Sequence, residues 1–470
     1  MITTATRFAG NILEQGYARE AGRLTRIALP LIMASLVNMS IAITDVIMMG
    51  WLGPTQLAAG AVVSDFYSLF YYLVAGVIAA ISPLISQARG AGNLDHVRSI
   101  TQQGFLVGIL LAIPGGWIVY HSEFALRTIG IADNIITISV PYAQMMAFTF
   151  VAMMAFNVMH YFLASHEKSR IIFLATLCGM PINALGNYIF MFGHFGFDAM
   201  GLAGAGLSSV ITACFMFLAV LVYVIRYKAF KSYSLLSKWR DQQNNYIPEL
   251  IHIGVPIGVA NLGQMGVFLL STVTMGVFGA EVLAAHAVTL RMAGVVFAIP
   301  TGFAQAATVR ISFVLGAQEH DSLFRIMRTA LAISITLGTI MLVSLIAWNV
   351  QITHGFLGSD ISVAILAQAT LFLAILAINQ PFSNLGVVGS GILRGFKDTR
   401  TPMLCSLTGF WGISFVGGWS LAFLFNAGGL GIWIGLTSGT IVYGLLVAYH
   451  LYQRFAPRSQ LMGTIAIAGA

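Results

Sequence analysis

Charged residues are scarce in this chain, which has 470 residues of which only 8% are Asp, Glu, Lys or Arg. Soluble domains carry about a quarter charged residues, so this composition excludes an ordinary soluble fold. Cysteine is also rare, and the three cysteines fall in apolar stretches at unrelated spacings, which predicts neither disulfides nor a metal cluster. Hydrophobic residues make up 58% of the chain instead. We therefore expect most of the protein to lie in a lipid bilayer.

The hydrophobic residues are grouped in twelve runs separated by polar stretches. A bilayer core about 30 Å thick needs about 20 apolar residues per helix, and each run is long enough. Unbroken apolar runs of this length exclude a transmembrane β-barrel. We therefore predict an all-α integral membrane protein with twelve transmembrane helices. The predicted spans are 26–51, 57–85, 101–120, 134–159, 169–192, 199–226, 250–278, 282–312, 327–350, 361–390, 402–425 and 429–453.

The basic residues are distributed by side of the membrane. The formal net charge is +7, which by itself would also fit a nucleic-acid-binding protein. If the N-terminus is cytoplasmic, however, every Lys and Arg except Arg127 and Arg291 lies in or beside an inward-facing tail or loop. This is the pattern of the positive-inside rule. We therefore expect both termini in the cytoplasm, membrane lipid as a partner, and no nucleic-acid partner.

The chain contains an internal repeat with an offset of 226 residues. Residues 30–63 are similar to residues 256–289, and the register continues into the next polar loop, where Gly90 aligns with Gly316. Each copy contains six spans, an even number, so both copies have the same orientation in the membrane. The sequence therefore predicts two six-helix lobes related by a pseudo-twofold axis along the membrane normal.

The repeat and the polar stretches together give a domain plan. The predicted parts are a cytoplasmic N-terminal segment (1–25), an N-lobe (26–226), a cytoplasmic linker (227–248), a C-lobe (249–454) and a cytoplasmic C-terminal tail (455–470). We expect the polar N-terminal segment to be a loosely ordered tail, and the alternative is a segment that lies at the membrane surface. Two lobes of this kind suit a transporter that works by alternating access. The alternative, a channel, would usually show a pore loop or a ring of polar residues, and the sequence has neither.

Asp45 is the main candidate for the chemistry of transport. Only Asp45 and Asp65 among the sixteen acids lie well inside predicted spans. A charged side chain at the centre of a membrane helix costs about 3 kcal/mol on insertion scales, so it is a functional candidate by default. The repeat places Ser271 at the position equivalent to Asp45. The site should therefore belong to the N-lobe alone.

The fifth span offers polar partners for this acid. Asn183 and Asn187 are four residues apart and share one face of a helix. Pro181, just before them, removes a backbone hydrogen bond and predicts a bend. A carboxylate, two amides and a freed carbonyl suit either a proton site or a loose oxygen cage for Na⁺. The alternative is that the asparagines only hydrogen-bond to neighbouring helices.

Asp65 and Arg291 are related by the repeat offset, so an acid and a base occupy equivalent places in the two lobes. Our hypothesis is an ion pair between the lobes that forms when the cleft is closed to the outside. The alternative is that each charge pairs locally or reaches the membrane surface. Tyr67 and Tyr71 are candidates for lining a cleft for flat apolar substrates, or else they are interfacial anchors. Met265 would suit a cavity that adapts to different shapes.

Several segments resemble one family. They are Thr44–Gly50 (TDVIMMG), Leu57–Gly60 (LAAG), Gln87–Gly92 (QARGAG), Val282–His286 (VLAAH) and Leu393–Asp398 (LRGFKD). With the twelve-span repeat, they resemble the multidrug and toxic compound extrusion (MATE) family in its NorM-like branch. The resemblance implies cation-coupled efflux of amphipathic compounds, with H⁺ or Na⁺ as the coupling ion and without enzymatic activity. It also implies that Asp45 and Asn183 bind the coupling ion, and Asn187 stands where some members have a second acid.

The chain departs from this family at two positions, because Gln264 and Ser383 stand where NorM-like members usually have acids. We therefore expect coupling to depend on Asp45 alone, with these two residues as further cleft candidates. The prediction is a monomeric antiporter of the bacterial inner membrane without a cofactor. It would export a small amphipathic drug, toxin or metabolite. H⁺ is favoured over Na⁺ because one carboxylate and neutral amides form a weak cation cage. The alternative is a flippase for a lipid-linked precursor.

Overall fold

The computed structural model describes residues 2–235, 244–358 and 362–468. Within these residues the secondary structure is helical and contains no strand. Twelve of the helices in the described part are long and apolar enough to cross a membrane. They correspond one to one with the predicted spans, so the predicted fold class is confirmed. The predicted start of the tenth span, residue 361, lies outside the described residues, and its helix begins at Val363.

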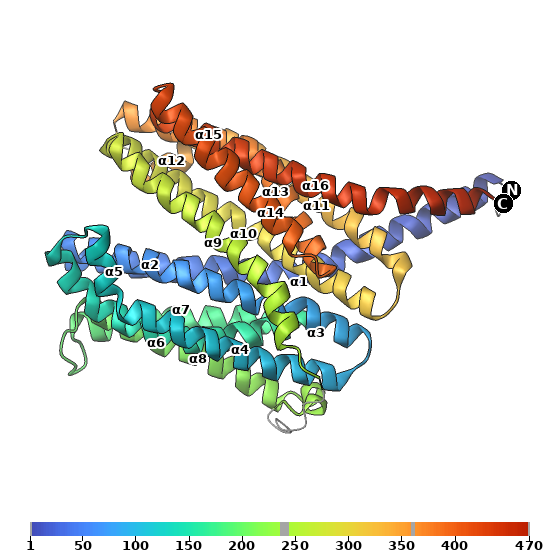
Figure 1. Ribbon diagram of the computed structural model, residues 1–470, viewed down its shortest axis with the longest axis horizontal. Helices are drawn as coiled ribbons and strands as arrows, with labels where there is room; N and C mark the ends of the chain where they lie inside the picture. Colours follow the sequence, from blue (N-terminus) through green and yellow to red (C-terminus); the bar gives the residue numbers. More distant parts are fainter. Residues whose placement is uncertain (1, 236–243, 359–361, 469–470) are drawn as a thin grey trace. The chain divides into compact units, whose positions relative to one another are not determined.

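Ten of the spans are single helices, and two are composite (Figure 1). The single ones are α1 (Ile2–Leu52), α4 (Leu94–Tyr120), α6 (Asp133–Ser165), α7 (Ser169–Phe192), α8 (Leu202–Arg226), α9 (Ile247–Val277), α10 (Ala280–Gly316), α11 (His320–Ala347), α13 (Val363–Gly395) and α16 (Gly428–Ala468). The composite spans are α2 (Pro54–Ile78) with α3 (Ile81–Gly90), and α14 (Arg400–Leu407) with η2 (Thr408–Phe415), α15 (Val416–Trp419) and η3 (Ser420–Leu424). The short elements are α5 (Ser122–Ile129), α12 (Asn349–Leu357) and the 3₁₀-helix η1 (Lys228–Tyr233).

The chain divides into two compact units. Unit 2 contains Arg26–Leu262 and Ser312–Glu319, and unit 1 contains Met1–Thr25, Gly263–Ile311 and His320–Ala470. In unit 2, α8 packs against both α6 and α7, and α4 packs against α6 (Figure 1). In unit 1, α13 packs between α11 and α16. The helices α1, α9 and α10 each contribute residues to both units. The lobe boundaries expected from the sequence stay a prediction.

The repeat is visible in how the last turns of α3 and α10 end. The amide of Asn93 donates to the carbonyl of Ala88, and at the same offset the amide of Glu319 donates to the carbonyl of Val314. Gly92 has a φ of 72° and its equivalent, Gln318, has a φ of 61°. Both helices therefore end in the same left-handed cap. These segments all belong to unit 2, and they show the 226-residue register in the backbone itself.

These two helix ends also cross each other at their glycines. A Cβ atom on Gly90 would collide with the carbonyl oxygen of Phe313, and a Cβ atom on Gly316 would collide with the carbonyl oxygen of Gln87. Gln87 and Phe313 are again separated by 226 residues. The contact is therefore reciprocal about a local twofold axis. Only glycine lets two helix backbones approach this closely.

The N-terminal segment differs from its expectation. Helix α1 begins at Ile2, and the segment expected to be a loose tail is part of this helix. Leu24 is fully buried, and Glu20 is buried in an ion pair with Arg310 of α10. The prediction of a loosely ordered tail is therefore wrong for residues 16–25. The polar composition of this segment did not predict a helix, because the partner of its buried acid Glu20 is Arg310, which lies 290 residues later in the chain.

The predicted linker is bound to unit 2 on both sides of residues 236–243, which lie outside the described residues. Before this gap, the Nε2 atom of Gln102 donates to the carbonyl of Leu235 at 2.9 Å. After it, the Nε2 atom of Gln103 donates to the carbonyl of Asn244 at 2.7 Å, and its Oε1 atom accepts from the amide of Tyr246. Two consecutive glutamines of α4 therefore hold the two ends of the connection.

Candidate functional site

Three residues predicted to bind the coupling ion come together in unit 2. Asp45 on α1 and Asn187 on α7 are in contact although they lie 142 residues apart, with Nδ2 of Asn187 donating to Oδ1 of Asp45 at 2.6 Å. The same Nδ2 atom lies 3.5 Å from Oδ1 of Asn183, so Asn183 lies next to the pair. The sequence placed both amides on one helix face, and the structure shows that this face meets Asp45. Their role in ion binding stays a prediction.

The amides are held in place by close contact between α7 and α8. Asn183 and Asn187 are both buried, and Oγ of Ser208 on α8 donates to the backbone carbonyl of Asn183 at 2.8 Å. A Cβ atom on Gly186 would collide with the same Ser208 hydroxyl. The glycine therefore lets α8 approach the turn of α7 that carries the amides. Pro181 lies inside α7, which continues through it as one helix, so the expected bend stays a prediction.

The carboxylate has both donors and an acceptor beside it. Oδ1 of Asn187 is buried and has no hydrogen-bond partner in the described part of the chain. On α6, the hydroxyl of Tyr142 lies 3.4 Å from Oγ of Ser64 on α2. Among the described residues there is no group of three or more His, Cys, Asp or Glu that could hold a metal ion. The site therefore contains one carboxylate with two neutral amides beside it.

The tyrosines predicted as cleft residues lie between α2 and α6. Their rings are stacked, with the centroids of Tyr67 and Tyr71 5.7 Å apart. The Tyr67 hydroxyl is 2.7 Å from Oγ1 of Thr149, and Nδ2 of Asn157 donates to the Tyr71 hydroxyl at 3.3 Å. Tyr67 is buried, which does not fit an interfacial anchor. Thr149 and Asn157 are not among the residues predicted from the sequence, although two polar residues spaced eight apart in an apolar span are a usable signal.

The other predicted residues are described within their own units. Asp65 is exposed and belongs to unit 2, whereas Arg291 is exposed and belongs to unit 1. The ion pair between them therefore stays a prediction. Gln264, Met265 and Ser383 are partly buried and belong to unit 1. Their roles as cleft or gate residues also stay predictions.

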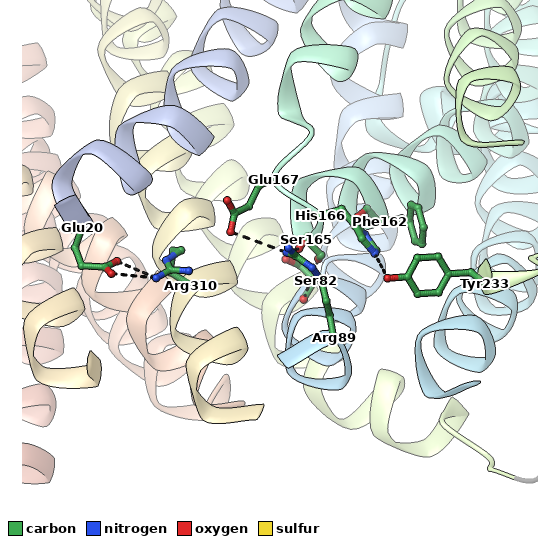
Figure 2. Close-up of polar contacts among 9 residues, drawn as sticks. All are labelled: Glu20, Ser82, Arg89, Phe162, Ser165, His166, Glu167, Tyr233 and Arg310. Carbon is green, nitrogen blue, oxygen red and sulfur yellow. Dashed lines mark hydrogen bonds and ion pairs between the residues drawn. The ribbon is translucent and has the colours of Figure 1, made fainter. Parts of the chain in front are cut away.

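A polar cluster that the sequence did not reveal connects the ends of several unit 2 elements (Figure 2). Nη1 of Arg89 donates to the carbonyl of Ser165 at 2.6 Å and lies 4.0 Å from the carboxylate of Glu167. His166 follows α6, and its Nδ1 atom is 2.7 Å from the carbonyl of Phe162. A carbonyl can only accept, so Nδ1 carries the proton. Nε2 then accepts from the Tyr233 hydroxyl at 2.9 Å.

This cluster needs a neutral imidazole. His166 lies between two spans and is buried. Burial lowers its pKa from 6.5 to about 4, with the nearby charge of Arg89 acting in the same direction and the bond to Phe162 against it. Burial also raises the pKa of Tyr233. Both groups are therefore neutral near pH 7, and the pair fixes η1 to the end of α6.

The comparisons with known proteins agree with the internal repeat. The family model MatE matches the chain twice, over residues 30–189 and 256–420, which together are more than half of it. The two matches start 226 residues apart, which is the offset read from the sequence. The chain belongs to the multidrug and toxic compound extrusion (MATE) family. The family assignment made from the sequence is therefore confirmed. MATE proteins are membrane transporters.

Relatives and solved structures cover nearly the whole chain. A protein named probable multidrug resistance protein NorM from Mesorhizobium japonicum is 31% identical, over 94% of this chain and 96% of that protein. One of the same name from Synechocystis is also 31% identical, over 91% and 94%. The eukaryotic MATE transporter AtDTX14 has a TM-score of 0.82 at 20% identity, over 93% of this chain and 96% of that one. A mutant of the Vibrio cholerae MATE transporter VcmN has a TM-score of 0.84 at 17% identity, over 95% and 98%. At these identities the structures show the fold alone.

Proposed function

We propose that this MATE protein is a proton-coupled antiporter that exports small amphipathic drugs, toxins or metabolites. The observation that carries the proposal is the contact between the Asp45 carboxylate and the Asn187 amide inside a membrane-spanning helix pair. The curated relatives named above are multidrug resistance proteins by name, which supports efflux as the direction of transport. The positive-inside pattern supports an inner-membrane location with both termini in the cytoplasm. We expect the transporter to work as a monomer.

The contacts of Asp45 favour H⁺ over Na⁺. The Asn187 amide presents its N–H to Oδ1 of Asp45, which suits a carboxylate and leaves that oxygen less available to a metal cation. A Na⁺ site would need several oxygen ligands directed toward one point, and Asn187 turns its N–H, not its oxygen, toward Asp45. A proton needs only one carboxylate. The coupling ion is therefore H⁺ in this proposal.

Asn187 can serve both protonation states of the acid. When Asp45 is ionised, Nδ2 of Asn187 donates to it, as observed. When Asp45 is protonated, its O–H becomes a donor, and the amide can accept from it by rotating half a turn to present Oδ1. Oδ1 has no partner among the described residues at present, so the rotation breaks no bond at that atom. Proton uptake would thus change the contact between α1 and α7, and this change is the step that we couple to substrate release on the outer side.

The test is transport by purified protein in liposomes with an imposed pH gradient. Wild-type protein should drive uptake or release of ethidium, an amphipathic cation, when the gradient is applied without Na⁺. Asp45→Asn, which copies the protonated acid, should lose at least 90% of this transport. Asp198→Asn is the matched control, because Asp198 is exposed in a loop outside the candidate spans. It should transport at the wild-type rate.

Two outcomes would overturn the proposal. Transport by Asp45→Asn at the wild-type rate would remove Asp45 from the mechanism. Transport that requires a Na⁺ gradient and ignores the pH gradient would replace H⁺ by Na⁺. A third arm tests the alternative of a flippase, by following translocation of a fluorescent polyprenyl-phosphate lipid in the same liposomes. Lipid translocation without ethidium transport would favour that alternative.

A further inference from the structure

The buried ion pair between Glu20 and Arg310 is a feature that the proposed transport site does not use. Nη2 of Arg310 lies 3.1 Å and 3.0 Å from the two carboxylate oxygens of Glu20, as Figure 2 shows. Nη1 of Arg23 adds a third contact to Glu20 at 2.8 Å. The side chains of Glu20 and Arg310 are only 7% and 6% exposed, so water contributes little to their solvation. The pair joins residues that are 290 positions apart.

Glu20 continues the buried face of α1. Glu20, Leu24, Ile27 and Leu31 follow one another at spacings of four, three and four residues and are all buried. This spacing places them on one side of the helix. Three of these four residues are apolar, and the one nearest the N-terminus, Glu20, is an acid. The same helix carries Asp45, about 38 Å further along at 1.5 Å per residue.

An apolar residue at this position would pack against α10 without the cost of burying a charge. Replacing a buried ion pair by apolar residues of similar volume is often neutral or stabilising, so burial alone does not explain the pair. Fixing one register between two helices is the best-attested use of a buried polar pair. The turn of α1 that lies against Arg310 is the one that carries Glu20. The pair therefore sets the rotation and position of α1 on α10.

The position of the pair along α1 matters because the helix changes unit just after it. Residues up to Thr25 belong to unit 1, and those from Arg26 onward, including Asp45, belong to unit 2. Pro30 has no amide hydrogen, so the carbonyl of Arg26 loses its usual partner within the helix. The helix is weakened where its residues change unit, and Glu20 is anchored on the unit 1 side of that point.

We propose that Glu20 is a positioning residue for transport, which holds the base of α1 on α10 so that a movement of the helix at Asp45 is passed to unit 1. This inference rests on the proposed function, because it takes Asp45 as the group that binds the proton. Arg310 on α10 is the partner that holds Glu20, and with it this end of α1, in one orientation. Without the pair, α1 can turn at its weakened point, and proton binding at Asp45 no longer drives the substrate step.

The experiment uses the full chain in liposomes and measures two quantities on the same preparation. One is ethidium binding at equilibrium, and the other is the number of protons moved per ethidium transported. Glu20→Gln should bind ethidium within twofold of wild type, transport it at least tenfold more slowly, and move more protons per ethidium. The exchanged pair, Glu20→Arg with Arg310→Glu, should recover at least half of the wild-type rate and proton ratio.

A second double variant covers the case in which Glu20→Gln fails to fold. Glu20→Met with Arg310→Met leaves no buried charge without a partner, so it should fold and bind ethidium. It should still transport slowly with a raised proton ratio, because the register between α1 and α10 is lost. Glu123→Gln, which removes an exposed acid paired with Arg127, is the matched control and should behave as wild type.

The proposal is overturned if the Met–Met variant transports at the wild-type rate with the wild-type proton ratio. It is also overturned if the exchanged pair folds and binds ethidium but recovers no transport. A merely structural role would lower the amount of folded protein and leave the proton ratio per transported ethidium unchanged. Failure of the proposed function is distinguishable, because it would appear in Asp45→Asn, whose transport would then persist whatever happens at Glu20.

Discussion

At the scale of single residues, a buried polar group is informative when its partner is known. Asp45 was recognisable from the sequence because acids are rare in membrane spans. That Asn187 rather than Asn183 makes the 2.6 Å contact depends on how α7 is turned against α1, which no local pattern contains. His166 gave no signal at all, because its partner Tyr233 comes from an element 67 residues later.

The neutral imidazole of His166 predicts a pH dependence of stability. Its pKa is about 4 in the folded protein and about 6.5 when unfolded, so the unfolded chain binds a proton more readily between these values. The contribution is fully present above pH 6.5 and is lost as the pH falls toward 4. The upper limit is about 3 kcal/mol at 1.36 kcal/mol per pH unit. Unfolding temperatures in detergent, measured at pH 7.5 and pH 5, should therefore fall more for wild type than for His166→Gln.

The control for this experiment is His121→Gln, because His121 is exposed and lies outside the candidate spans. Its pH dependence should match that of wild type. Equal pH dependence of wild type and His166→Gln would contradict the assignment of Nε2 as the acceptor for Tyr233. His166 helps to attach η1 to the end of α6. Replacing it should therefore change the unfolding temperature and leave the number of protons moved per ethidium unchanged.

At the scale of elements, the crossing of α3 and α10 shows what glycine does in this fold. The sequence aligned Gly90 with Gly316, but it did not indicate that the two glycines meet. Each lies against a backbone carbonyl of the other segment, at Phe313 and Gln87. A side chain there has no flexible neighbour to displace. The repeat therefore brings its own equivalent positions into contact in unit 2.

Gly90→Ala and Gly316→Ala should each destabilise the protein. Inserting a methyl group into a closely packed contact costs about 1–3 kcal/mol, and these contacts are between backbones, which favours the upper end. Gly276→Ala is the matched control, because Gly276 lies in α9 with open space where a Cβ would go. Its unfolding temperature in detergent should equal or exceed that of wild type. A drop for Gly276→Ala as large as that for Gly316→Ala would contradict the role of the crossing.

At the scale of the whole molecule, the two halves share a backbone plan but not a chemistry. The family model matches both halves at the repeat offset, and the caps after α3 and α10 are alike. Asp45, however, has Ser271 as its equivalent, and Arg310, the partner of Glu20, has Leu84. The repeated fold thus supports two different halves, one with the candidate proton site and one with the anchor for its helix.

The hypothesis of an ion pair between Asp65 and Arg291 also belongs to this scale. If the two charges attract each other during the cycle, Asp65→Arg and Arg291→Asp should each lose most ethidium transport in liposomes, because each places two like charges together. The double variant with exchanged charges should restore at least half of the wild-type rate. Both single variants must be expressed and folded at wild-type levels for the comparison. Absence of any recovery in the double variant would refute the pairing.

The sequence by itself determined the twelve spans, the repeat, the family and the isolation of Asp45, because hydrophobic length, register and the cost of charge in lipid are local properties. It also placed Asn183 and Asn187 on one helix face, since that follows from the helical period. Only the tertiary structure decided which amide reaches Asp45, and that an apparently loose N-terminal segment is anchored through Glu20. Contacts between residues 142 and 290 positions apart depend on how helices rotate and pack, and periodicity carries no information on that.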